Sequence, residues 1–116
     1  MSTVDKLVLT PTEGAQPNQL VYLLQGPLTL GNLFAVQEAL KSTAPVLILD
    51  LSGVPYVDSA GVGALVQCLV TRRKQGYRLL LVAPNEPVQK LFKLTQVDSL
   101  LEVFPTIEAA QSSQDS

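Results

Sequence analysis

The sequence predicts a single α/β domain with a mixed β-sheet, in which an initial hairpin is followed by parallel strands and about four helices. Two apolar runs, residues 46–49 and 78–82, show no alternation of polar and apolar side chains. Such runs are typical of strands that are covered on both faces of a parallel sheet. Stretches with helical spacing follow both runs, and strands that alternate with helices are joined by right-handed crossovers.

The first elements are a hairpin and a helix. Strands are expected at residues 7–9 and 20–24, separated by a long polar loop that Pro11 and Pro17 mark. Thr29 is a candidate cap for the helix that follows. The apolar residues predicted to share the inward face of this helix are Leu30, Leu33, Val36 and Leu40.

The last third of the chain contains weaker signals. Asn85 or Glu86 is expected to cap a third helix, because Pro87 follows and suits a first helical turn. A short edge strand is expected at residues 102–104. Thr106 can then cap a last helical turn, after which the chain is polar.

Composition limits the function. The 116 residues are 47% hydrophobic and 16% charged, which fits one domain over residues 1–116 with a core at about 4–110 and a polar tail at 111–116. The net charge of -2 argues against nucleic-acid binding, and the basic cluster 72–74 is interpreted as complementing a helix C-terminus. Cys68 is the one cysteine, expected to be half-buried, and histidine is absent, so neither a disulfide nor the usual zinc site is predicted. No signal or membrane-spanning pattern occurs, so a cytoplasmic location is expected.

Residues 50–61 join the strand at 46–49 to the second helix, and they form the candidate functional region. Ser59 stands where the N-cap of this helix is expected, and its hydroxyl would there accept a hydrogen bond from a backbone N–H. A helix N-terminus also favours added negative charge. The apolar residues predicted to form one buried stripe along this helix are Val62, Leu65, Val66, Leu69 and Val70.

The opposite side of the second helix is small and uncharged. No charged residue occurs between Ser59 and Arg72. Because a solvated helix face normally carries charges, this side is either a surface kept clear for a partner or is buried on both sides. Ser59 is likewise either a simple cap or a site of modification, with the Asp58 carboxylate directly before it. The side holds Ala60, Ala64, Gln67 and Thr71, flanked by Gly63 and Cys68.

Residues 50–61, with the sequence DLSGVPYVDSAG, resemble the signature of the STAS domain, in particular that of stand-alone bacterial anti-sigma factor antagonists. The resemblance runs from about residue 20 to residue 110 and implies the same α/β fold. Its central motif is specific, whereas the outlying matches count mainly by their order. These outlying matches are Gly26, Pro27 and Leu28, then Gly76, then Pro87 and Val88, and finally Val97 and Asp98.

The resemblance implies a regulator that is not an enzyme and needs no cofactor or metal. Ser59 would be phosphorylated by an anti-sigma factor that is an ATP-dependent serine kinase, and dephosphorylated by a PP2C-like phosphatase. In that family the unphosphorylated antagonist binds the anti-sigma factor and so releases the sigma factor. From the resemblance and the uncharged helix face, the residues predicted to contact the partner are Thr29, Asp58, Ser59, Ala60, Gly61, Gly63, Ala64 and Gln67.

The chain departs from the family pattern at two positions. Ala60 replaces a second serine that is often found there, which leaves Ser59 as the only hydroxyl on the turn. Thr29 stands where the family commonly has aspartate, so the contact or cap made by that carboxylate is in doubt. For Gly61 and Gly63, close approach to the partner and simple helix packing both remain open.

Other functional classes fit the sequence less well. A strand, a turn, a serine and a helix also occur in serine hydrolases, but this chain has half of their glycine pattern and no histidine to act as the base. A two-component receiver would need an acidic cluster around Asp50 to hold Mg²⁺. The remaining alternative is a STAS-like module that is never phosphorylated and acts as a scaffold or binds a small ligand.

Overall fold

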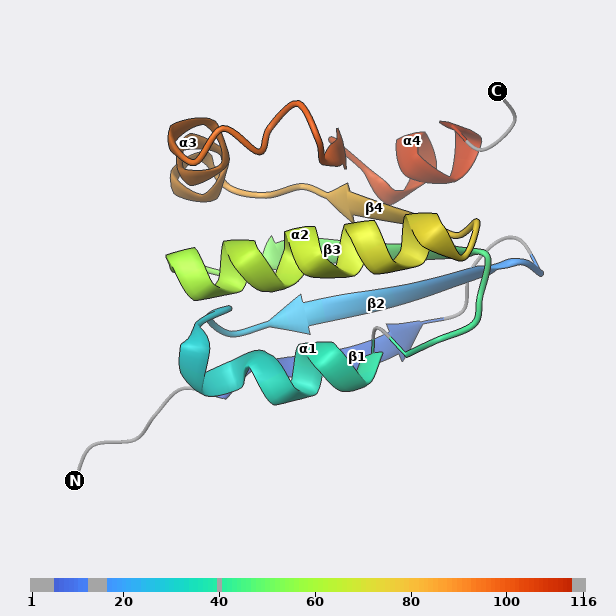
Figure 1. Ribbon diagram of the computed structural model, residues 1–116, viewed down its shortest axis with the longest axis horizontal. Coiled ribbons are helices and arrows are strands. Elements are labelled where there is room, and N and C mark those ends of the chain that lie inside the picture. The colour runs from blue at the N-terminus through green and yellow to red at the C-terminus, as the bar shows by residue number, and fades with distance from the viewer. Residues whose placement is uncertain (1–5, 13–16, 40, 114–116) are drawn as a thin grey trace.

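The computed structural model describes residues 6–12, 17–39 and 41–113 of the chain. Its centre is a five-stranded sheet with the order β1-β2-β3-β4-β5 (Figure 1). β1 pairs with β2 in an antiparallel manner, and the other three pairings are parallel, so the predicted mixed sheet is confirmed. The strands are β1 (Val8–Thr12), β2 (Gln19–Gln25), β3 (Val46–Gly53), β4 (Arg78–Val82) and β5 (Glu102–Phe104).

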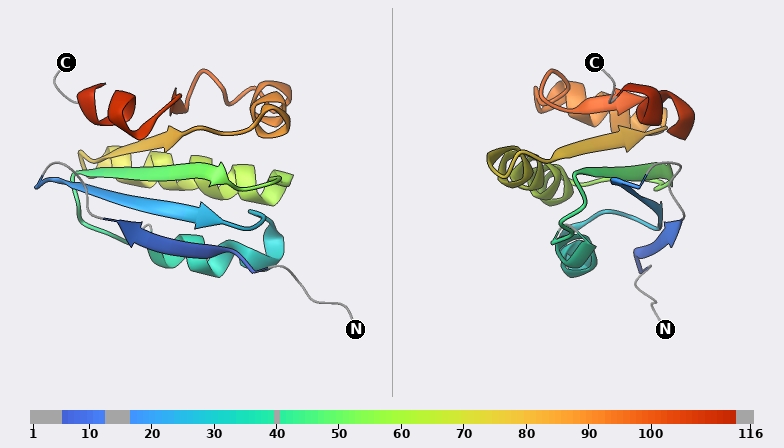
Figure 2. Two further views of the ribbon diagram at one scale, coloured as in Figure 1. Left: turned by 180° about the vertical axis from the view of Figure 1, so that it is seen from behind. Right: turned by 90° about the vertical axis from the view of Figure 1, so that its right-hand side faces the viewer.

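The helices lie unevenly on the two faces of the sheet. Figure 2 shows α1, α2 and α3 on one face and α4 on the other. This division creates two cores, a large one under the first three helices and a small one under α4. The helical elements are the 3-10 turn η1 (Leu30–Asn32), α1 (Leu33–Ala39), α2 (Ser59–Lys74), α3 (Glu86–Leu94) and α4 (Ile107–Ser112).

β3 is the most enclosed strand because both of its faces are covered. Leu47, Leu49 and Leu51 point into the large core, whereas Ile48 belongs to the small core. The apolar run without alternation therefore indicated a central strand correctly. All four parallel strands, β2 to β5, end at the same edge of the sheet, and the turn before α2 lies at this edge.

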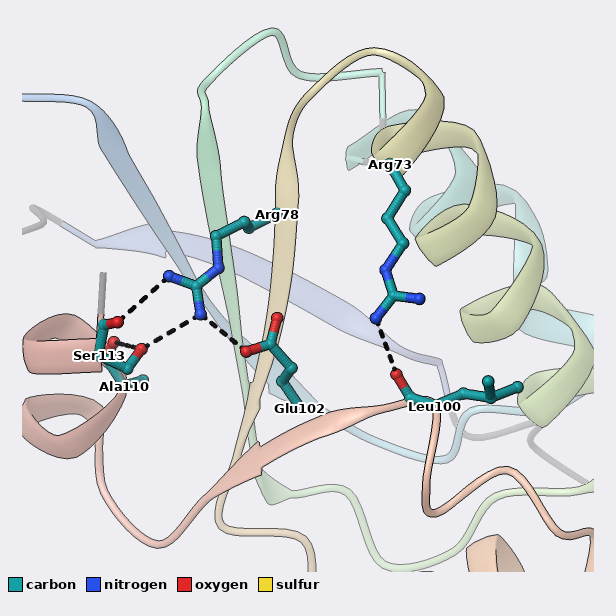
Figure 3. A network of polar contacts seen from close by, with 6 residues as sticks. All are labelled: Arg73, Arg78, Leu100, Glu102, Ala110 and Ser113. Atoms are coloured by element: carbon teal, nitrogen blue, oxygen red, sulfur yellow. Dashed lines mark hydrogen bonds and ion pairs between the residues drawn. The ribbon is translucent and has the colours of Figure 1, made fainter. Parts of the chain in front are cut away.

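Two polar anchors fix α4 and the basic end of α2 (Figure 3). Arg78 of β4 forms an ion pair with Glu102 of β5 at 2.7 Å and donates to the backbone oxygen of Ser113 at 3.5 Å. Arg73 donates to the backbone oxygen of Leu100 at 3.3 Å. Arg72 is almost fully buried and donates to the backbone oxygens of Ser42, Ala44 and Arg78. The interpretation of the basic cluster 72–74 as structural is thus confirmed for Arg72 and Arg73.

Several sequence predictions about single residues are wrong. Pro11 lies in β1 and not in the loop, which an edge strand tolerates because its outer side has no partner strand. Leu30 is 71% exposed, since it belongs to a 3-10 turn that lies out of phase with α1. Residues 111 and 112 of the predicted tail belong to α4, and Leu40 lies outside the described residues.

Two predictions about α2 also need correction. Val70 is 44% exposed, whereas Arg72 takes a buried position one turn from Leu69. Cys68 is buried and not half-buried.

Over the described parts of the chain, no helix is long and apolar enough to cross a membrane, and no three residues of the types His, Cys, Asp or Glu form a group that could hold a metal ion.

Candidate functional site

The turn before α2 is tied to the loop after β2. Leu28 and Val57 form an isolated parallel bridge, in which the Leu28 N–H donates to the Tyr56 oxygen at 3.1 Å and the Asp58 N–H donates to the Leu28 oxygen at 3.2 Å. Nearer the sheet, the Gly26 N–H donates to the Gly53 oxygen at 3.0 Å. These bonds extend the pairing of β2 and β3 beyond the sheet, so both loops are held in one conformation.

Asp58 caps α2, and Ser59 does not. One carboxylate oxygen of Asp58 accepts a hydrogen bond from the Gly61 N–H at 2.8 Å, and the other accepts from the Leu30 N–H at 3.1 Å. The predicted cap at Ser59 is therefore wrong by one residue. Aspartate competes well for this position because its charge also interacts favourably with the helix dipole. Asp58 thus fastens the N-terminus of α2 to η1.

Ser59 is the first residue of α2 and its side chain is exposed. Its hydroxyl makes no hydrogen bond with any residue that the structure describes. The Asp58 carboxylate uses the Gly61 N–H, and the Val62 N–H donates to the Asp58 backbone oxygen at 3.0 Å. The N–H groups of Ser59 and Ala60 then remain at the helix end, where an added anion can bind them.

Gly61 and Gly63 differ in their surroundings. A Cβ atom at Gly61 would overlap the backbone oxygen of Leu28, so this glycine lets α2 approach the loop after β2 closely. At Gly63 a Cβ atom would meet nothing within 4 Å. Packing inside the chain therefore explains Gly61, whereas Gly63 lies on open surface.

The uncharged side of α2 faces outward. Gly63, Gln67 and Thr71 are exposed, and Ala60 and Ala64 are half-buried. Burial on both sides is thereby excluded within this chain. Figure 1 shows α1 and α2 side by side on the same layer. A groove of about 210 Å³ is lined by Gln37 of α1, by Lys41 after the end of α1, and by four residues of α2, Ala64, Gln67, Cys68 and Thr71.

Thr29 precedes η1 at the N-cap position but its side chain makes no capping hydrogen bond. Its hydroxyl oxygen lies 3.5 Å from the Asn32 side-chain nitrogen instead. The prediction that Thr29 caps is therefore wrong. The backbone N–H of the next residue, Leu30, is the group that Asp58 binds.

Asn85 connects α3 to the same turn. Its side-chain oxygen accepts from the Val88 N–H at 2.9 Å, which confirms it as the cap of α3. Its side-chain nitrogen donates to the Pro55 oxygen at 3.1 Å. An open hollow of about 640 Å³ lies nearby, at the end of the sheet. Its lining residues are Lys6, Val8, Gln25, Gly26, Pro27, Ser52, Gly53, Val54, Pro55 and Asn85.

Two titratable groups in α2 are shifted by burial. Desolvation raises the pKa of the Cys68 thiol from 9.0 to about 11, although the Arg72 charge opposes the shift. Desolvation also lowers the pKa of Arg72, which nevertheless keeps three carbonyl partners and lies 5.2 Å from the centre of the Tyr77 ring. A thiol with so high a pKa is a poor nucleophile at neutral pH.

A family model described as STAS domain matches residues 10–110. The chain belongs to the STAS domain family. A curated protein of Thermotoga maritima, described as a candidate anti-sigma factor antagonist, is 34% identical over 64 residues, which cover 55% of this chain and 57% of that protein. The match thus spans little more than half the length of that relative.

The STAS fold is also found in solved structures. The crystal structure of a candidate anti-sigma factor antagonist from Thermotoga maritima has a TM-score of 0.79 at 22% identity, with 92% of each chain covered. The anti-sigma factor antagonist SpoIIAA in its unphosphorylated form has a TM-score of 0.74 at 17% identity, with 94% of this chain and 98% of that chain covered. At these identities the likeness shows the fold.

Within this STAS domain, the predicted contact residues fall into two groups. Ser59, Gly63, Ala64 and Gln67 lie along the outward side of α2, while Asp58 and Gly61 serve the packing of its N-terminus. Two apolar residues near this turn, Leu30 of η1 and Phe34 of α1, are 71% and 74% exposed.

Proposed function

We propose that this protein is an anti-sigma factor antagonist whose activity is switched by phosphorylation of Ser59. In its unphosphorylated form it binds an anti-sigma factor that is also a serine kinase, and this binding releases the sigma factor. The kinase phosphorylates Ser59 and a PP2C-type phosphatase restores the hydroxyl. The observation that supports this proposal most is Ser59 itself, an exposed hydroxyl without a partner among the described residues, on a turn that its neighbours hold in place.

The position of Ser59 suits phosphorylation without refolding. A phosphate adds about -1.5 to -2 charges and three acceptor oxygens. The N–H groups of Ser59 and Ala60 and the helix dipole can accommodate this charge at the first turn of α2. Asp58 already holds the Gly61 N–H at 2.8 Å, so the cap does not depend on the Ser59 hydroxyl.

The same charge would act against a partner on the outward side of α2. That side carries no charged residue from Ser59 to Thr71, and a partner complementary to it must bury the Ser59 hydroxyl. A phosphate there must be desolvated and lies beside the Asp58 carboxylate, and both effects oppose association. The proposed switch therefore acts at the interface.

Capture of the partner tests the proposal. Tagged wild type, Ser59→Ala and Ser59→Asp are used to capture proteins from a lysate of the source cells. We expect the wild type and Ser59→Ala to retain an ATP-binding serine kinase and Ser59→Asp to lose it. Ser99→Asp is the matched control, because it adds the same charge at an exposed serine in the turn before β5 and should not change capture. Equal capture of the kinase by Ser59→Asp would contradict the proposal.

A constitutive module that binds a small ligand is the second candidate. It is favoured by the hollow of about 640 Å³ at the end of the sheet, which combines the Lys6 ammonium group with side chains such as Ser52 and Gln25. In that case, wild type, Ser59→Ala and Ser59→Asp would retain the same partners. A screen of metabolites for a rise in the unfolding temperature, abolished by Ser52→Tyr, would support this second candidate.

A further inference from the structure

We propose that Asp58 is a positioning residue for the phosphorylation of Ser59, because its carboxylate fixes where the Ser59 hydroxyl lies. This inference rests on the proposed function and extends it to the way in which the site is held. One oxygen of the Asp58 carboxylate accepts from the Gly61 N–H at 2.8 Å, and the other accepts from the Leu30 N–H at 3.1 Å. Asp58 touches no reacting atom, and Ser59 remains the residue that is modified.

The second carboxylate oxygen of Asp58 does more than a helix cap requires. The caps of α3 and α4 are neutral side chains that accept with one oxygen, since Asn85 accepts a backbone N–H at 2.9 Å and Thr106 accepts one at 3.0 Å. Neutral side chains of this kind cap a helix about as well as aspartate does. The bond from Asp58 to Leu30 is therefore additional to capping, and it ties the start of α2 to η1.

The place of the Ser59 hydroxyl depends on the backbone of the turn. Ser59 is the first residue of α2, and its hydroxyl has no hydrogen-bond partner among the described residues. Before it, the Asp58 N–H donates to the Leu28 oxygen at 3.2 Å. After it, Gly61 approaches the same oxygen so closely that a Cβ atom would overlap it. The bond to Leu30 adds a further tie to this loop, from the side chain directly before Ser59.

Phosphoryl transfer depends on this placement. The Oγ atom of Ser59 forms a bond to the γ-phosphorus of ATP, the bond from that phosphorus to the β,γ-bridging oxygen breaks, ADP leaves, and a base of the kinase takes the hydroxyl proton. A displacement of about 1 Å can lower the rate of such a step about 100-fold. The first turn of a helix cannot adjust its backbone to a kinase as an extended peptide can, so the antagonist itself must supply the geometry.

Two substitutions break the bond between Asp58 and Leu30 from opposite ends. Asp58→Asn leaves one acceptor oxygen where two are needed. Leu30→Pro removes the backbone N–H and keeps the carboxylate. Proline fits there, because Leu30 begins η1 and Thr29 before it is extended, with φ -133° and ψ 171°. Leu30→Ala is the matched control, since it shortens the same exposed side chain but retains the N–H.

Steady-state kinetics test the role in phosphorylation. The kinase captured with Ser59→Ala is supplied with ATP and Mg²⁺, and intact mass measures the phosphate added to each full-length protein. We expect Asp58→Asn and Leu30→Pro each to lower kcat at least about tenfold and to change KM less than about threefold. Partial unfolding has a different signature, because it lowers the amount of folded substrate and so raises KM while kcat stays the same. Leu30→Ala should remain within about twofold of the wild type.

The double variant and hydrogen exchange test the bond itself. Because Asp58→Asn and Leu30→Pro break the same bond, kcat of the double variant should lie within about twofold of that of the slower single variant. Hydrogen exchange needs no kinase. We expect the Leu30 amide proton to exchange at least about tenfold faster in Asp58→Asn than in the wild type. Equal exchange would show that the bond is not made in solution and would overturn the inference.

The kinetic outcomes separate the inference from the proposed function. Wild-type kcat in Asp58→Asn and Leu30→Pro, with phosphate still on Ser59, would overturn the inference and leave the proposed function standing. A loss in Asp58→Asn alone would show that the kinase recognises the charge and not the bond, and an equal loss in Leu30→Ala would assign the effect to the side chain. Either result would also overturn the inference. If no captured kinase phosphorylates wild-type Ser59, both the inference and the proposed function are overturned.

Discussion

Asp58 and Ser59 are neighbours at the start of α2, but they contribute to different properties. Asp58 accepts hydrogen bonds from the N–H groups of Gly61 and Leu30 and so stabilises the turn. Ser59 is exposed, and its hydroxyl has no partner among the described residues. The stability of the turn and the proposed phosphorylation switch are therefore assigned to separate residues.

Substitution by alanine should separate these two properties. Asp58→Ala removes the cap and leaves the Leu30 N–H without its partner, so we expect the free energy of unfolding to fall by about 1–2 kcal/mol. Ser59→Ala should change it by less than about 0.5 kcal/mol. Urea unfolding at neutral pH measures both values. A larger loss for Ser59→Ala than for Asp58→Ala would show that the serine is the cap.

The two glycines of the first turns of α2 form a second matched pair. Gly61→Ala would push a methyl group into the Leu28 backbone oxygen, and we expect a loss of about 2–3 kcal/mol in the free energy of unfolding. Gly63→Ala meets open space and should raise stability by up to about 1 kcal/mol, since alanine favours a helix. Thermal and urea unfolding measure the stability of both variants. A Gly63→Ala variant that is less stable than the Gly61→Ala variant would contradict the close approach at Gly61.

Cys68 gives the protein a dependence on alkaline pH. Its pKa is raised by burial from 9.0 to about 11, so between these values the unfolded chain loses the thiol proton and the folded chain keeps it. The thiol therefore stabilises the fold fully below about pH 9, and this contribution decreases as the pH rises toward 11. In Cys68→Ala, the unfolding temperature should fall less steeply between pH 8.5 and 10.5 than in the wild type. Parallel curves for the two proteins would contradict the assigned shift.

At the scale of elements, Arg72 connects the end of α2 to the segment before β3. Its guanidinium group donates to the backbone oxygens of Ser42, Ala44 and Arg78, which would otherwise lack these partners. We expect Arg72→Met to lower the free energy of unfolding by about 3 kcal/mol, because buried polar groups lose their hydrogen bonds. Lys74→Met, at an exposed position two residues away, should cost less than about 0.5 kcal/mol. Equal effects in urea unfolding would contradict the structural role of Arg72.

The elements themselves were largely predictable because their signals are local. Apolar runs indicated β3 and β4, and side-chain caps at Asn85 and Thr106 marked the starts of α3 and α4. The errors arose where contacts between different elements determine the local structure. The cap of α2 moved to Asp58 because this carboxylate also binds Leu30, a residue from another element.

At the scale of the whole molecule, the mixed sheet and the position of the turn at its edge followed from the sequence, whereas the placement of α1 beside α2 did not. Ser59 and the outward side of α2 lie in one continuous stretch of sequence. α1 lies beside α2 because the crossovers place both helices on the same face of the sheet. No periodicity within either helix encodes that contact.

Phosphorylation of Ser59 should leave the folded molecule unchanged away from the turn. The two loops at this edge are held by backbone hydrogen bonds and by both oxygens of Asp58, none of which involves the Ser59 hydroxyl. In amide NMR spectra we expect shifts at the start of α2 and near Leu30, with β4, β5 and α4 unaffected. Large shifts in those distant elements would indicate a conformational switch instead.

The most direct measurement is the intact mass of the protein purified from its own cells, compared with that of Ser59→Ala. If Ser59 is the switch, the wild-type sample contains a species heavier by one phosphate, and Ser59→Ala contains none. A phosphate that persists in Ser59→Ala, or its absence from the wild type under all growth conditions, would contradict the assignment of Ser59 as the regulated residue.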